Sequence, residues 1–120
     1  MLNTNWALTL GRIFFAVPFF MFGVAHFRMA EEMATIVPNY LPYGIYWVYF
    51  TGLVLLLAAI AIVAKMWMQW ACYGLAIFLA FVICMVHLPS MLAGSDMGLT
   101  ALLKDLGLLG GALVLSTWRN

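Results

Sequence analysis

The rest of the chain can be interpreted from residues 98–118, GLTALLKDLGLLGGALVLSTW. It is long enough to cross a bilayer, because about 20 apolar residues in a helix span the roughly 30 Å hydrocarbon core. Lys104 and Asp105 lie inside it. An ionisable side chain at that depth costs about 2.5–3.5 kcal/mol on insertion scales. We therefore expect both side chains to have polar partners on other helices.

The composition indicates a membrane protein. Of the 120 residues, 68% are hydrophobic and 8% are charged, whereas a soluble domain has about 25% charged residues. The formal net charge of +1 gives no basic surface for nucleic acid. The sequence has no phosphate-binding glycine loop, HExxH pattern or paired CxxC pattern, and its histidines and aspartates lack the spacing of a metal site. We expect residues 1–120 to form a single integral membrane domain.

Four apolar runs predict an all-α fold, a four-transmembrane-helix bundle with a short interfacial helix and loop between the first two helices. The predicted spans are 6–27, 45–64, 68–88 and 98–118. Pro18 interrupts the first run, and His87 with Pro89 is expected to end the third. Cys72 and Cys84 share the third span about 18 Å apart, too far for a disulfide, so we expect them to pack as small apolar residues.

The connection 28–44 between the first two spans carries its own signals. Arg28 precedes Glu31 and Glu32 at spacings that face each other on a helix, so a short interfacial helix is predicted over 28–36. Pro38 and Pro42 then force extended backbone, and a cluster of aromatic residues fits the headgroup level. The connection is either an anchor or a lid, and the lid candidates are Glu31, Glu32, Pro38, Tyr40 and Pro42.

The remaining polar residues are expected to gather at one end of the bundle. The first and third spans run in the same direction, so His26 and His87 fall at the same, outer end. Lys104 and Asp105 lie about 9–10 Å beyond the start of the fourth span, and project about 100° apart, so they do not face each other. Arg12, about 9 Å in from the opposite end, is a candidate partner of Asp105. These five residues are the candidate ligand-binding site, and a structural ion pair that fixes helix register is the alternative.

Three glycines on the fourth span predict close helix packing. Gly107 and Gly111 are four residues apart, with Gly110 beside them, and such faces allow two backbones to approach. Their partner is either another helix of the same bundle or a second copy of the chain.

The basic residues predict the orientation. Lys65 and Arg119 lie on the side of the termini, with Arg12 if its side chain extends to that surface, and Arg28 lies on the other side. Because basic loops stay in the cytoplasm, we expect a multi-pass protein of the cytoplasmic (inner) membrane with both termini in the cytoplasm.

Several short motifs together resemble the DoxX family of small four-helix membrane proteins. They are Gly11-Arg12, His26-Phe27, Val37-Pro38-Asn39-Tyr40-Leu41-Pro42, Thr51-Gly52, and Lys104-Asp105-Leu106 followed by Gly110-Gly111. Two positions depart from the family pattern. Leu55 stands where the family often has a glutamate, and His87-Leu88-Pro89 replaces a proline–asparagine pattern.

The resemblance implies a bacterial or archaeal cytoplasmic membrane and an association with quinone-linked sulfur or thiol oxidation. We therefore expect a membrane subunit or accessory protein of a quinone-linked redox system that binds a quinone or lipid, has no covalent cofactor, and receives electrons from a partner protein. The alternatives are a non-enzymatic assembly or scaffold subunit of a larger membrane complex, and a small-molecule or lipid transporter formed by several copies. Its expected partners are membrane lipid and either another membrane protein or further copies of itself. Whether it is an enzyme stays open.

Overall fold

The structure is a computed structural model that describes residues 5–118, and no strand occurs among them. The helices in chain order are α1 (Asn5–Arg28), α2 (Ala30–Ala34), α3 (Gly44–Ala64), α4 (Met68–Val82), the π-helical turn η1 (Ile83–His87), α5 (Leu88–Leu92) and α6 (Asp96–Ser116). Four helices in this part of the chain are long and apolar enough to cross a membrane: Asn5–Arg28, Gly44–Ala64, Met68–Leu92 and Asp96–Ser116. The predicted all-α fold with four spanning helices is confirmed.

The surface of these helices explains why they need lipid. Large apolar side chains point outward along all four: Phe14, Ile77 and Val114, for example, are 67%, 72% and 74% exposed. Within a bilayer such side chains are solvated by hydrocarbon, while each helix satisfies its own backbone. The protein is therefore a multi-pass membrane protein.

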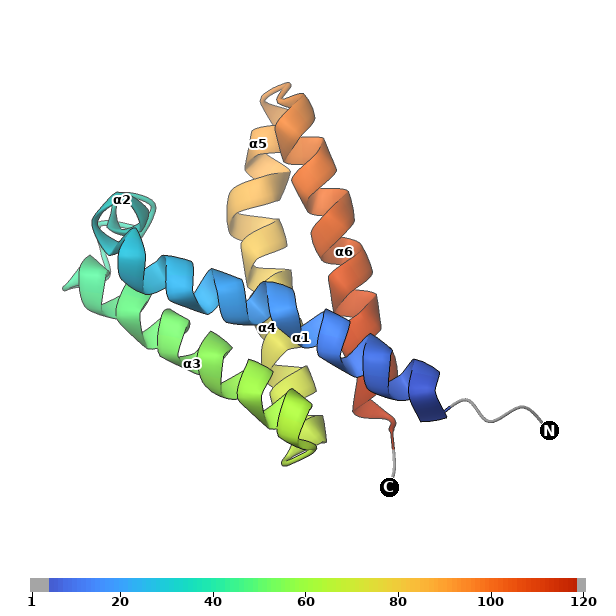
Figure 1. Cartoon of the computed structure of the whole chain (residues 1–120). Coiled ribbons are helices and arrows are strands. Elements are labelled where there is room, and N and C mark those ends of the chain that lie inside the picture. Colours follow the sequence, from blue (N-terminus) through green and yellow to red (C-terminus); the bar gives the residue numbers. More distant parts are fainter. Residues whose placement is uncertain (1–4, 119–120) are drawn as a thin grey trace. The chain divides into compact units, whose positions relative to one another are not determined.

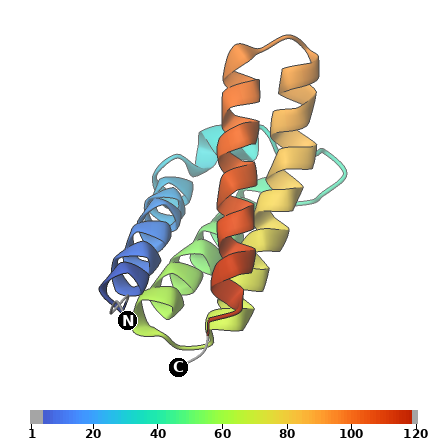
Figure 2. The same ribbon diagram turned by 90° about the vertical axis from the view of Figure 1, so that its right-hand side faces the viewer.

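The chain divides after Met66 into two compact units. In the first unit, α1 and α3 run antiparallel and side by side, with α2 packed near one end of the pair (Figure 1). In the second unit, the continuous helix Met68–Leu92 runs antiparallel to α6 (Figure 2). Each unit is thus a helical hairpin.

Two glycines allow the close approach of α1 and α3. A Cβ added at Gly23 would lie 2.8 Å from Leu56 Cγ and 3.0 Å from the carbonyl oxygen of Gly52. A Cβ added at Gly52 would lie 2.8 Å from the Cβ of His26 and 3.2 Å from the carbonyl oxygen of Gly23. Neither position has room for a side chain without a shift of backbone or packed side chains. Gly23 and Gly52 therefore form the crossing point of the first hairpin.

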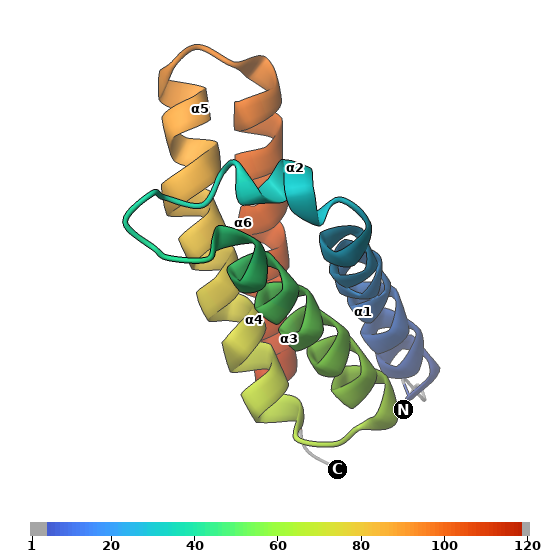
Figure 3. The ribbon, with the colours of Figure 1, turned by 90° about the vertical axis from the view of Figure 1, so that its left-hand side faces the viewer.

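The connection between α1 and α3 is partly as expected. The short helix is α2, which covers only Ala30–Ala34 of the predicted 28–36. Residues 35–43, which include Pro38 and Pro42, are not helical (Figure 3). The indole N–H of Trp47 donates to the carbonyl oxygen of Pro42 at 3.0 Å and ties the end of this loop to the first turn of α3.

The third spanning helix is longer than predicted. His87 and Pro89 were expected to end it, but it continues to Leu92. The reason is that Pro89 lies at the start of α5, directly after the π-helical turn. A proline is tolerated in the first turn of a helical segment, where its missing N–H removes the fewest backbone bonds. The prediction that Pro89 ends the helix was wrong.

The second hairpin is fixed at its turn. The Ser95 hydroxyl accepts a hydrogen bond from the backbone N–H of Gly98 at 3.0 Å and caps the N-terminus of α6. A Cβ added at Gly98 would lie 2.6 Å from Ser90 Oγ and 2.9 Å from the backbone nitrogen of Met91. α5 and α6 therefore approach closely at Gly98, and this contact sets their register.

The Gly23–Gly52 crossing predicts a difference between two Gly→Ala variants. Gly52→Ala should lower the free energy of unfolding by about 1–3 kcal/mol, the usual cost of overpacking. Gly107→Ala is the matched control, because nothing lies within 4 Å of a Cβ at that position. Unfolding in mixed micelles, followed by circular dichroism, measures both. Equal unfolding midpoints for the two variants would contradict the crossing point.

Candidate functional site: a histidine–aspartate pair between two spanning helices

The candidate site lies in the second hairpin. Nε2 of His87 lies 2.9 Å from Oδ2 of Asp105. The Asp105 side chain is 7% exposed and that of His87 is 20% exposed. A buried carboxylate in an apolar segment is stabilised only by a close polar partner, and His87 supplies it. The sequence predicted both residues as site candidates, and the structure brings them together.

The hairpin geometry explains how the two side chains meet. From the close contact of Ser90 with Gly98, His87 is three residues away on one helix and Asp105 is seven residues away on the other. At 1.5 Å per residue, the Cα atoms of His87 and Asp105 therefore lie at levels roughly 6 Å apart along the hairpin axis. Helical side chains lean toward the N-terminus of their own helix, so on antiparallel helices these two lean toward each other and close the gap.

His87 is the last residue of the π-helical turn η1. In this turn the N–H of Leu88 donates to the carbonyl oxygen of Ile83, five residues back. A π-helical turn is rare and is frequent at functional sites, because one additional residue per turn rotates the residues that follow. Nothing in the apolar sequence around Cys84 signalled this turn.

Lys104 also contacts Asp105. Its Nζ lies 3.8 Å from Oδ1 of Asp105, and its side chain is 55% exposed. The two Cβ atoms project about 100° apart, but the lysine side chain is long enough for its Nζ to reach Asp105. The separation is longer than a hydrogen bond, so His87 makes the tighter contact.

The cluster of His87, Lys104 and Asp105 has a defined chemistry. Asp105 occupies Nε2 of His87, which fixes the orientation of the imidazole and leaves Nδ1 for another partner. Among residues 5–118, the interactions of His87 involve Nε2 alone. Two nitrogen donors flank one carboxylate, so the cluster can bind and polarise an oxygen atom of a small molecule.

Arg12 lies in the first hairpin and is 5% exposed. Its Nη1 donates to the carbonyl oxygen of Ile62 at 2.8 Å and to that of Val63. These carbonyls belong to the last turn of α3, where helical N–H donors run out, and the Ile62 oxygen otherwise accepts only from the N–H of the C-cap residue Lys65 at 3.3 Å. The guanidinium thus caps the negative end of the α3 dipole. Arg12 and Asp105 belong to different units, and their predicted pairing stays a prediction.

The guanidinium of Arg12 lies near the end of α3. Its Nη1 atom is level with the carbonyls of Ile62 and Val63, one or two residues before the end of α3 at Ala64. That is about 1.5–3 Å from the end of that helix.

His26 is also in the first hairpin. Its Nδ1 lies 2.7 Å from the carbonyl oxygen of Phe22, one turn earlier on the same helix. Its Cβ borders Gly52 at the helix crossing. Leu55, which stands where the resembled family often has a glutamate, is fully buried. The predicted grouping of His26 with His87 joins two separate units and stays a prediction.

The lid candidates lie on α2 and on the loop that follows it. Glu31 and Glu32 are exposed in α2, and Tyr40 is 77% exposed in the loop. The hydroxyl of Thr35 donates to the carbonyl oxygen of Glu32 at 2.6 Å and caps the end of α2. A lid and an anchor both fit this placement, so the lid stays a prediction.

Two of the three α6 glycines lie away from the other helix of the second hairpin. Gly107 and Gly110 are exposed, and within this hairpin nothing lies within 4 Å of a Cβ built at either. Their expected partner, another helix of the same bundle or a second copy of the chain, stays a prediction. The glycines in close contacts are Gly23, Gly52 and Gly98, which lack the four-residue spacing and so gave no signal.

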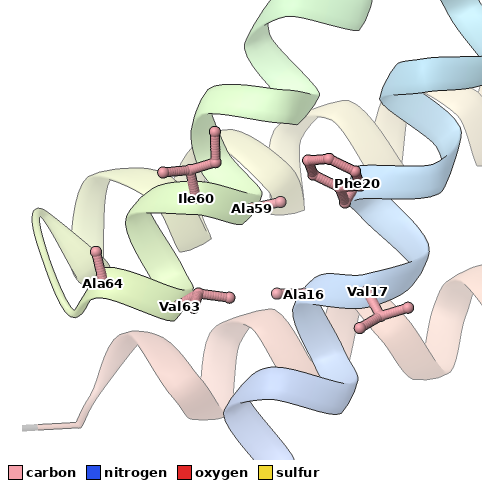
Figure 4. Close-up of a pocket in the computed structure, with 7 residues that line it drawn as sticks. All are labelled: Ala16, Val17, Phe20, Ala59, Ile60, Val63 and Ala64. Atoms are coloured by element: carbon pink, nitrogen blue, oxygen red, sulfur yellow. The ribbon is translucent and has the colours of Figure 1, made fainter.

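The first hairpin also carries an apolar groove of about 340 Å³ (Figure 4). Its lining comes from α1 and α3 and contains only apolar residues: Ala16, Val17, Phe20, Ala59, Ile60, Val63 and Ala64. A groove without polar atoms suits a hydrocarbon chain and offers nothing to orient a polar head.

Other chemistry-bearing residues form no further site. Cys72 is buried in α4, Cys84 is exposed in η1, and both are free thiols. The expected packing is confirmed for Cys72 and was wrong for Cys84. Among residues 5–118 no group of three His, Cys, Asp or Glu side chains is placed to hold a metal ion.

Fold and site together define a multi-pass, all-α membrane protein with a polar cluster between two of its spanning helices. The chain belongs to the family described as a domain of unknown function (DUF8561), whose model matches residues 15–103. The matched region includes His87, and it ends one residue before Lys104. No curated protein and no solved structure matches the chain.

The geometry of the cluster predicts unequal coupling energies. A double-mutant cycle with His87→Leu and Asp105→Leu should give a coupling of about 1.5–3 kcal/mol, as expected for a hydrogen bond with a charged partner. The same cycle with Lys104→Leu and Asp105→Leu should give a smaller value, because 3.8 Å is beyond hydrogen-bond distance. Unfolding in mixed micelles measures both. Coupling that is larger for Lys104 would reverse the assignment of partners.

Proposed function

We propose that this protein is a membrane subunit or accessory protein of a quinone-linked redox system. In this proposal the cluster of His87, Lys104 and Asp105 binds the polar head of a quinone-like amphipath. The observation that carries the proposal is the 2.9 Å contact of His87 with a buried aspartate inside two apolar helices. An intramembrane ionisable residue is expensive and marks a functional site more often than not.

The cluster suits a quinone head for two reasons. A quinone oxygen accepts hydrogen bonds, and Lys104 can donate them, as can Nδ1 of His87 when both ring nitrogens carry a proton. The helices around the cluster expose apolar side chains to the bilayer, where an isoprenoid tail dissolves. The resemblance of His26-Phe27 and Lys104-Asp105-Leu106 to the DoxX family supports the same function, and electrons would be supplied by a partner protein.

An assembly or scaffold subunit is the second candidate. The exposed face that contains Gly107 and Gly110 favours it, since nothing in the second hairpin lies within 4 Å of a Cβ built at either position. Such a face suits close packing of another spanning helix.

The test is extraction of lipid and quinone from the purified protein. Quinone should be recovered in stoichiometric amount from the native chain and lost from His87→Leu and Asp105→Asn. The matched control is Thr100→Val, because the Thr100 hydroxyl bonds only to the carbonyl oxygen of Asp96 on its own helix. Recovery of a tightly bound membrane protein and no quinone would support the scaffold instead. Equal quinone in His87→Leu and native protein would refute the site.

We also propose that both termini are cytoplasmic. The basic residues on that side are Lys65 and Arg12, which lies level with the end of α3, together with Arg119, which is outside the described residues. On the other side Arg28 lies near Glu31 and Glu32.

The orientation can be tested by cysteine labelling in a variant without native cysteines. Met97→Cys, at the start of α6, should react with a membrane-impermeant maleimide in intact cells. Met66→Cys, in the turn between α3 and α4, should react only after lysis. Both residues are exposed, at 84% and 57%, so the reverse labelling would reverse the orientation and keep the four spans.

A further inference from the structure

The apolar groove of the first hairpin extends to the end of α3. Small side chains leave the hollow: Ala16 on α1 and Ala59 on α3 line it, and Val63 points toward Ala16 across it (Figure 4). Val63 and Ala64 belong to the last turn of α3. Lys65 follows Ala64 directly in the chain and is exposed. A basic residue therefore comes immediately after the end of the groove lining.

Arg12 adds a second cation at the same end of the hairpin. Its Nη1 donates to the carbonyl oxygens of Ile62 and Val63, so the guanidinium lies level with the groove residue Val63. Trp6, one to two turns earlier on α1, is 65% exposed, and tryptophan at the end of a spanning helix is typical of the headgroup level. The groove thus begins where lipid headgroups meet hydrocarbon.

The two ends of this hairpin differ in charge. Between residues 5 and 66 the acidic residues are Glu31 and Glu32, which lie on α2 after Arg28, at the opposite end from Lys65. One end therefore carries two cations and no acid, and the other carries one cation and two acids. Only the end with the groove is complementary to an anionic headgroup.

The groove alone cannot select one lipid from another. The acyl chains of a bilayer are as apolar as its lining, so a chain gains little free energy by leaving its neighbours for the groove. Selection has to come from the head. Basic residues near the membrane surface attract anionic headgroups, and a lysine ammonium donates hydrogen bonds to phosphate.

We propose that the groove and Lys65 form a binding site for an anionic phospholipid. One acyl chain lies along α1 and α3, and the phosphate lies at Lys65. Arg12 adds positive potential from below the headgroups and keeps its hydrogen bonds to α3. The inference is independent of the quinone proposal, because the groove and the pair of His87 with Asp105 belong to different units.

The headgroup preference can be measured on the native protein. The full chain in mild detergent receives equal amounts of phosphatidylglycerol and phosphatidylcholine with identical acyl chains, and native mass spectrometry counts the lipids that stay bound. Phosphatidylglycerol should be retained roughly fivefold more often, the attraction expected for one basic residue near a membrane surface. Glycerol phosphate, which has the charge and no acyl chain, should not be retained.

Two pairs of variants locate the site. Lys65→Gln should bring the ratio of the two lipids close to one. Arg28→Gln is its matched control and should keep the native ratio, because Arg28 is also exposed and lies at the other end of the same hairpin. Val63→Phe fills the groove from a side chain that is 47% exposed and should lower retention of phosphatidylglycerol. Val54→Phe makes the same change on α3 outside the groove, at a side chain that is 38% exposed, and should not.

Several results would overturn the inference. Equal retention of the two lipids by the native protein would do so without any variant. Equal loss in Lys65→Gln and Arg28→Gln would make the preference a property of total charge. If Val63→Phe releases a quinone, the groove holds an isoprenoid tail, and if it releases a second copy of the chain, the groove is a dimer contact. Either result would replace the phospholipid as the occupant.

Discussion

The second hairpin depends on one contact, the 2.9 Å approach of His87 to the carboxylate of Asp105. The rest of α6 is so apolar that it could slide or rotate against α4 at little cost. Asp105 removes this freedom, because its carboxylate must face a donor or remain unpaired in a low-dielectric surrounding. The Ser95 cap and the Gly98 contact fix the turn, and the contact of His87 with Asp105 fixes the register one to two turns below it. A polar pair in this position serves specificity of packing.

The first hairpin also contains a buried charge, but this charge has a different kind of partner. Its buried charge, Arg12, is satisfied by backbone carbonyls at the end of α3 rather than by an acid. Those carbonyls need donors in any case, so cation and helix end stabilise each other without a counter-charge. The Nη1 atom of Arg12, which donates to the carbonyls of Ile62 and Val63, thus caps the end of α3. The two buried charges among residues 5–118 thus have polar partners within their own hairpins, and of the two only Asp105 has a partner with a ring nitrogen left for another contact.

The sequence predicted the features of the fold that follow from hydropathy. It did not predict the features that depend on backbone hydrogen bonding and on how helices cross. The four spans and the non-helical segment with Pro38 and Pro42 followed from apolar runs and proline chemistry. His87 and Asp105 were identified because polar residues in such runs are rare. The π-helical turn was missed, because hydropathy does not report which carbonyl a given N–H reaches, and with it the continuation of the helix past Pro89. The contact of Gly23 with Gly52 was missed as well, because the two glycines meet only where α1 and α3 cross.

The most direct test of the account measures the pair itself. The protein is labelled with ¹⁵N in histidine and ¹³C at the side-chain carboxylate of aspartate, placed in lipid bilayers, and examined by dipolar recoupling in solid-state NMR. Strong dephasing between His87 Nε2 and Asp105 Cγ, absent in Asp105→Asn, is the predicted result and corresponds to the 2.9 Å Nε2–Oδ2 contact. Absence of that dephasing in folded protein would mean that α4 and α6 pack in another register, and the site built on their contact would not exist.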